Sequence, residues 1–148
     1  MDQLTIEDYI GLYLDKSYSQ VTNLSNFTAI IMEMVSNLNW VGFYLYNGQE
    51  LYLGPFQGKA AVQTISIGEG VCGLSAEKKE MIVVDDVHQF EGHIACDDAS
   101  NSEIVIPIII NDRLFGVLDI DSPVHNRFDA LTAKELNDAV KLLSKYLS

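Results

Sequence analysis

The feature that most constrains the fold is the change in the spacing of apolar residues that begins at Trp40. Before it, apolar residues recur every three or four positions over about 6–19 and 23–38, which is the spacing of amphipathic helices. From Trp40 onward, short runs rich in aromatic and branched residues are separated by turn residues, a pattern typical of strands. The chain is therefore expected to place two helices before a sheet.

The runs with strand character are short, and tight turns link several of them. Asn47-Gly48 follows the first run and is a strong hairpin signal, while Asn111-Asp112-Arg113 joins the last two runs. The runs are Trp40–Tyr46, Leu51–Phe56, Met81–Val84, Ile104–Ile110 and Leu114–Ile120.

Two further helices are expected, a short one over about 71–79 and a last one over about 131–146 that follows Asp129. The 148 residues contain no repeat or linker and suit one domain. A hydrophobic fraction of 48% and a charged fraction of 20% are those of a globular chain. We expect residues 1–148 to form a single α+β domain with an antiparallel sheet flanked by helices.

The charge and the N-terminal segment restrict the partners and the compartment. A formal net charge of −12 repels phosphate backbones and anionic membranes, so neither nucleic acid nor a membrane is expected as a partner. No apolar run approaches the ~20 residues of a membrane span. The segment 1–5 lacks the basic start of a signal peptide, and we expect a cytoplasmic protein whose two cysteines act as thiols.

Cys96 lies in the polar segment 85–102, close in sequence to His88 and His93. A loop cysteine near histidines can have a lowered pKa and act as a nucleophile. The aspartates that follow it favour the protonated thiol instead. From these residues alone, a nucleophilic Cys96 and a buried, inert Cys96 are equally acceptable interpretations.

Cys72 lies beside glycines at a predicted helix start, where the helix dipole favours a thiolate. Simple packing in the core is the better interpretation without other information. The two cysteines and the histidines lack the paired close spacings of a zinc site, so a metal is not expected.

Three carboxylates lie on or beside two apolar strands. Asp119 and Asp121 are two positions apart and therefore point to the same face of their strand, and Glu103 opens the neighbouring one. Buried charges need compensation. The alternatives are a solvated strand end and a carboxylate cluster that receives an ammonium group.

Trp40, the only tryptophan, alternates with Gly42 and Tyr44 along the first strand. Aromatic residues in strands usually pack in a core. The functional alternative is an aromatic wall against a methyl or sulfur group of a ligand.

Seven blocks together resemble the free methionine-R-sulfoxide reductase family, a catalytic branch of the GAF domains, over nearly the whole chain. The blocks are Asn39–Tyr44, Gly54–Lys59, Gly68–Gly73, Asp86–His88, Gly92–Asp97, Ser100–Val105 and Gly116–Ser122. The resemblance implies one GAF domain over 1–148, with a six-stranded antiparallel sheet and helices on its faces.

The resemblance also implies a mechanism in which Cys96 attacks the sulfoxide sulfur, releases methionine and becomes a sulfenic acid. A second thiol then forms a disulfide with it, and thioredoxin restores both. Many relatives carry that second cysteine where this chain has Val62, so Cys72 is the expected partner of Cys96. Neither a metal nor an organic cofactor is implied.

By the same resemblance, Glu103, Asp119 and Asp121 hold the ammonium group of free methionine-R-sulfoxide and assist at its oxygen, with Glu103 and Asp121 as the catalytic pair. Trp40 and Tyr44 form the wall for its methyl end. Asp86 is a further contact. The sequence leaves the oligomeric state open between monomer and homodimer.

Two other classes stay open. The chain could be a GAF module that binds a small molecule or senses redox state without catalysis, or an interaction protein with an incidental thiol. Activity that disappears in a Cys96→Ser variant would separate the enzyme from both.

Overall fold

The computed structural model describes residues 3–92 and 98–147. The elements, in chain order, are α1 (Ile6–Tyr13), α2 (Gln20–Met34), β1 (Trp40–Tyr46), β2 (Glu50–Gln57), β3 (Thr64–Ser66), α3 (Gly70–Lys78), β4 (Ile82–Val84), the 3-10 turn η1 (Val87–Gln89), β5 (Ser102–Ile110), β6 (Arg113–Ser122) and α4 (Ala130–Ser144).

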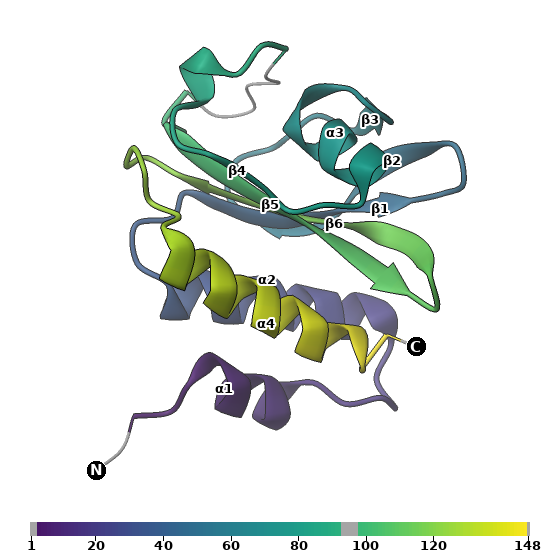
Figure 1. Ribbon diagram of the computed structural model, residues 1–148. Helices are drawn as coiled ribbons and strands as arrows, with labels where there is room; N and C mark the ends of the chain where they lie inside the picture. The colour runs from purple at the N-terminus through teal and green to yellow at the C-terminus, as the bar shows by residue number, and fades with distance from the viewer. Residues whose placement is uncertain (1–2, 93–97, 148) are drawn as a thin grey trace.

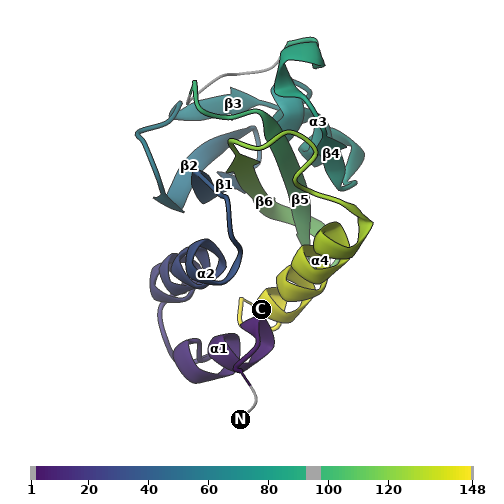
Figure 2. The ribbon, with the colours of Figure 1, turned by 90° about the vertical axis from the view of Figure 1, so that its left-hand side faces the viewer.

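The strands form one six-stranded sheet in the order β3-β2-β1-β6-β5-β4. Every neighbouring pair is antiparallel, so the predicted α+β class and antiparallel sheet are confirmed. Figure 1 shows α2 and α4 on one face of the sheet and α3 on the other. Helix α1 lies beyond α2 and α4, away from the sheet, as both views show (Figures 1 and 2).

The larger core lies between the sheet and the helices α2 and α4. It contains alternate residues of the central strands, such as Val41 and Phe43 of β1 and Leu118 and Ile120 of β6, all fully buried. The helices that cover it begin at side-chain caps, where Ser19 and Asp129 accept hydrogen bonds from backbone N–H groups of the first turn. This face is apolar and anchors the sheet.

The smaller core lies under α3 and uses the other set of alternate residues. Trp40, Tyr44 and Val117 pack there with Val71 and Cys72 of α3. The two-residue period of the strands thus sends one set of side chains to each face. No helix among the described residues is long and apolar enough to cross a membrane.

The first helix was predicted over about 6–19, and this boundary is wrong because α1 ends at Tyr13. Asn23 explains the early end: its side chain accepts a hydrogen bond from the Asp15 N–H and donates one to the Asp15 carbonyl. The Asp15 carboxylate also accepts from the Ser17 N–H at 2.9 Å. These local bonds compete with helical ones, so the chain turns here.

Strand β3 was not predicted, because three residues with one buried side chain are too short to show a periodicity. Strand β6 is longer than expected. It continues through Ser122, so Asp119 and Asp121 lie inside the strand and not at its solvated end.

Candidate active site

Three carboxylic side chains meet on the α3 face at the centre of the sheet. Glu103 of β5 pairs with Asp121 of β6, and Asp119 lies two residues away on the same face. Their side chains are only 4%, 8% and 7% exposed, respectively. Side chains directly opposite in antiparallel strands lie about 4.5–5.5 Å apart at Cβ, so the register brings the acids together. The predicted carboxylate cluster, and not a solvated strand end, is present.

Burial changes the protonation of this cluster. It raises the pKa of Glu103 to about 8, with the charge of Asp121 as the next cause. Burial also raises the pKa of Asp119 well above the usual range, and the charge of Glu103 adds to this shift. The pKa of Asp121 is raised in the same way, by burial and then by the charge of Asp119. Crowded carboxyl groups therefore keep protons at neutral pH, and the cluster can donate as well as accept them.

Two oxygen atoms of the cluster have no hydrogen-bond partner among the described residues. They are Oδ1 of Asp119 and Oδ1 of Asp121, and both are fully buried. A buried acceptor without a donor is destabilising, and such groups in native structures usually serve a ligand or a reaction. Each oxygen can accept a hydrogen bond from an ammonium group.

Cys72 lies against the cluster from α3. Its sulfur and one oxygen each of Glu103 and Asp119 lie within 4.8 Å of one another. Burial, followed by the charges of Asp119, Glu103 and Asp121, raises the pKa of the Cys72 thiol well above its usual value. The expected thiolate-favouring effect of the helix start is outweighed, since α3 presents this thiol to acids in the interior.

Cys72, Glu103 and Asp119 have the spacing of metal ligands, but they are not deprotonated as metal ligands are. A thiol and carboxyl groups bind metal ions as anions, and all three pKa values are raised. The arrangement favours proton exchange over metal binding.

Trp40 and Tyr44 of β1 form a stack beside the acids, with ring centroids 6.1 Å apart. Trp40 Nε1 donates to the Lys59 carbonyl at 2.9 Å, and the Tyr44 hydroxyl donates to the Val62 carbonyl at 2.8 Å. Because Trp40 pairs with Asp121 across the sheet, the rings and the acids share one face. The hydrogen bonds fix the ring planes, and both rings are buried in the core under α3.

Sequence reasoning missed three residues that build this site. Phe56 of β2 stacks on Trp40 at 5.3 Å, and Gly42 leaves the space, since a Cβ there would lie 2.5 Å from the indole. Ser100 hydrogen-bonds to Asp121 and accepts from the Asn39 amide at 3.0 Å. Phe56 could have been found from its place in the hairpin; Ser100 had no signal of its own.

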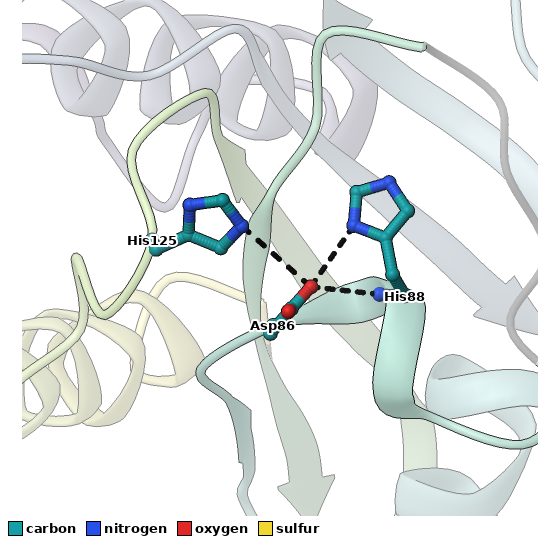
Figure 3. Close-up of side chains that lie close together, drawn as sticks. All are labelled: Asp86, His88 and His125. Atoms are coloured by element: carbon teal, nitrogen blue, oxygen red, sulfur yellow. Dashed lines mark hydrogen bonds and ion pairs between the residues drawn. The ribbon is translucent and has the colours of Figure 1, made fainter.

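Asp86, predicted as a further substrate contact, lies in a different cluster. It is partly exposed and lies beside His88 and His125 (Figure 3). Hydrogen bonds from His88 lower the pKa of Asp86, which is the opposite of the shift in the buried acids. Its contact with a substrate stays a prediction.

Cys96 and His93 lie outside the described residues. Ser100, four positions after Cys96 in the sequence, is buried beside Asp121. The described part of the site therefore consists of the acids, Cys72 and the aromatic residues.

Comparisons with known proteins agree with one another. The GAF-domain family matches residues 22–145. The chain is 45% identical over 130 residues to the "Free methionine-R-sulfoxide reductase" of Escherichia coli, covering 88% of this chain and 79% of the relative. It superposes on the reduced form of "fRMsr of Staphylococcus aureus" with a TM-score of 0.91, 45% identity and coverage of 97% and 92%. The same protein in "complex with substrate" gives a TM-score of 0.89 at 45% identity, with coverage of 97% of this chain and 93% of that chain.

Proposed function

This chain belongs to the GAF family and, within it, to the free methionine-R-sulfoxide reductases, and from that membership we propose that it reduces the R-sulfoxide of free L-methionine with Cys96 as the nucleophile. One observation carries the proposal. Buried, proton-retaining acids lie beside an aromatic stack on the α3 face of the sheet.

The acids provide the recognition of the free amino acid. Asp119 and Asp121 each offer a buried oxygen acceptor, and the substrate ammonium supplies the missing donors. Its positive charge also lowers the pKa values that burial has raised, so an aspartate that accepts from it can ionise. The methyl and sulfur end packs on Trp40 and Tyr44, since sulfur and methyl groups bind well on aromatic rings. A methionine sulfoxide inside a peptide chain has an amide in place of the free ammonium and is expected to be excluded.

Glu103 and Asp121 form the proposed acid pair. With a pKa of about 8, Glu103 is mostly protonated at neutral pH and can give a proton to the sulfoxide oxygen. Asp121 lies opposite Glu103 on the neighbouring strand and is the second member of the acid pair.

The Cys96 thiolate attacks the sulfoxide sulfur while the acid pair protonates the oxygen. The transient bond between the two sulfur atoms and the substrate sulfur–oxygen bond then break as the oxygen bonds to the Cys96 sulfur, which becomes a sulfenic acid. Methionine is released as the two-electron-reduced product. Cys96 holds the oxidising equivalents.

The Cys72 thiol then condenses with the Cys96 sulfenic acid, which forms a disulfide and releases water. Thioredoxin is the proposed reductant of that disulfide, in the cytoplasm, where thiols are kept reduced. Because Val62 occupies the place of the more usual cysteine and the pKa of Cys72 is raised, this condensation is the expected slow step. No metal or organic cofactor takes part in the proposal.

The test is NADPH consumption with thioredoxin, thioredoxin reductase and free methionine-R-sulfoxide. Cys96→Ser is expected to abolish turnover. Cys72→Ser is expected to keep one stoichiometric release of methionine and to lose most of the steady-state rate. An inactive wild type with every dithiol tried would instead support a GAF module that only binds a small molecule.

A further inference from the structure

Two loops outside the buried site bring an aspartate and two histidines together. Asp86 caps η1 and His88 lies within it, while His125 belongs to the connection between β6 and α4 (Figure 3). His88 Nδ1 lies 2.9 Å from Asp86 Oδ1, and His125 Nε2 lies 3.7 Å from the same oxygen. The imidazole rings are 65% and 52% exposed, so solvent ions can reach them.

The spacing of these atoms matches that of metal ligands. One donor atom from each residue lies within 4.8 Å of the other two. The edge of a tetrahedron with metal–ligand bonds of about 2.0 Å is about 3.3 Å, and the two measured separations, 2.9 and 3.7 Å, lie on either side of it. Both imidazoles point a ring nitrogen at the carboxylate, so small side-chain rotations are enough to admit an ion between them.

Backbone hydrogen bonds hold the donors in place independently of any ion. The His88 N–H donates to Asp86 Oδ1 at 3.0 Å and fixes the carboxylate as the cap of η1. The Asn126 N–H donates to the Asp85 carbonyl at 3.0 Å and joins the two loops next to the cluster. Residues far apart in sequence are thereby arranged before binding, which lowers the ordering cost of a ligand.

We propose that Asp86, His88 and His125 form a binding site for a zinc-class divalent metal ion. Two imidazole nitrogens and one carboxylate oxygen are a donor set that Zn²⁺ and its neighbours Co²⁺ and Ni²⁺ favour. The exposed side of the cluster leaves a fourth position for water. A bound ion joins the η1 segment to the β6–α4 loop, and the high negative charge of the chain favours its capture.

The test of this site measures metal binding and not turnover, so its outcome is separate from that of the proposed reductase chemistry. The reduced full chain is titrated calorimetrically with zinc chloride alone. His88→Ala, His125→Ala and Asp86→Asn are each expected to weaken zinc binding at least about tenfold, as loss of a direct ligand must exceed the effect of losing an outer partner. Asp85→Asn is the matched control, because its exposed side chain carries the same charge outside the cluster.

Cobalt distinguishes this site from the thiols. Co²⁺ bound to wild type is expected to give ligand-field bands without the sulfur-to-cobalt charge-transfer band that thiolate ligation produces. Zinc affinity that is unchanged in the His88→Ala/His125→Ala double variant would overturn the proposal, as would a charge-transfer band or only millimolar binding by wild type. Circular dichroism without metal checks that each variant is folded. Folding is expected, because both histidine side chains are exposed and contribute little to the core.

Discussion

The two faces of the sheet use the same strands for opposite purposes. Toward α2 and α4, β6 presents Leu118 and Ile120, which are fully buried among apolar side chains. Toward α3, the alternate positions are Asp119 and Asp121, which are nearly as buried but crowded with another acid and a thiol. One face provides stability, and the other carries groups whose burial opposes folding. The stability that the apolar core under α2 and α4 provides offsets the cost of burying the acids under α3.

The largest expected effect is a loss of activity without a loss of stability. Asp121→Asn keeps the shape of the side chain but removes a proton-exchanging group and an ammonium acceptor. We expect kcat/KM for methionine-R-sulfoxide to fall at least about 100-fold, the usual size of an acid–base contribution. The thermal unfolding temperature should be unchanged or higher, because an amide stays neutral at every pH and never adds a buried charge to the cluster.

Asp85→Asn again serves as the control for the change in charge, since Asp85 is exposed. Asp121→Asn with nearly normal turnover would contradict the placement of chemistry on the α3 face. A large drop in its unfolding temperature would contradict the claim that this face opposes folding.

The reverse result is expected on the other face. Leu136 of α4 is 1% exposed in the apolar core. Leu136→Ala should reduce the free energy of unfolding by about 2–5 kcal/mol, the range for leucine truncation in a core. In urea titrations the midpoint falls, while kcat/KM measured well below the unfolding temperature stays within about twofold of wild type. An activity loss as large as that of Asp121→Asn would show that the faces are not separable.

The raised pKa of Glu103 makes stability depend on pH in a definite direction. In the unfolded chain this carboxyl group has its ordinary pKa near 4.5, and in the folded protein the pKa is about 8. Between these values the folded state binds the extra proton, so the contribution is full at acid pH and is lost as pH rises through about 8.

The measurement is the unfolding temperature of wild type and of Glu103→Gln from about pH 5 to about pH 8.5, a window that spans the shifted titration. The variant cannot lose the proton, so its advantage over wild type should grow with pH. A difference that is constant across this range would mean that Glu103 titrates normally. Turnover by wild type is also expected to decline above about pH 8 as the proton donor is lost.

The sequence predicted the architecture well because periodicity reports which side chains are buried. The alternation through Trp40 and Tyr44 and the i, i+2 spacing of Asp119 and Asp121 placed each pair on one face of its own strand. The strand register, which the sequence does not show, brings both pairs to the same face of the sheet. The end of α1 was not predictable, because it depends on the hydrogen bonds that Asp15 makes with Asn23, eight residues further along the chain.

Contacts between segments distant in sequence account for the rest. Nothing near Asp86 in the sequence indicates His125, which joins it only because the loops at one end of the sheet meet. The direction of the Cys72 pKa shift likewise depends on acids from two other strands. A local helix-start argument points the other way, and tertiary burial is the larger effect.

The smallest expected effect shows whether the Tyr44 hydroxyl only holds the ring in place or acts on the substrate. Tyr44 stacks on Trp40 with its ring, while its hydroxyl donates to the Val62 carbonyl. Tyr44→Phe keeps the ring and leaves the part-buried Val62 carbonyl without this donor, so it should reduce the free energy of unfolding by about 0.5–1.5 kcal/mol. KM should change by less than about threefold, since the ring that packs on the methyl end remains. If instead kcat fell more than tenfold with KM unchanged, the hydroxyl would be acting on the sulfoxide itself, and the aromatic stack would belong to the chemistry and not to its support.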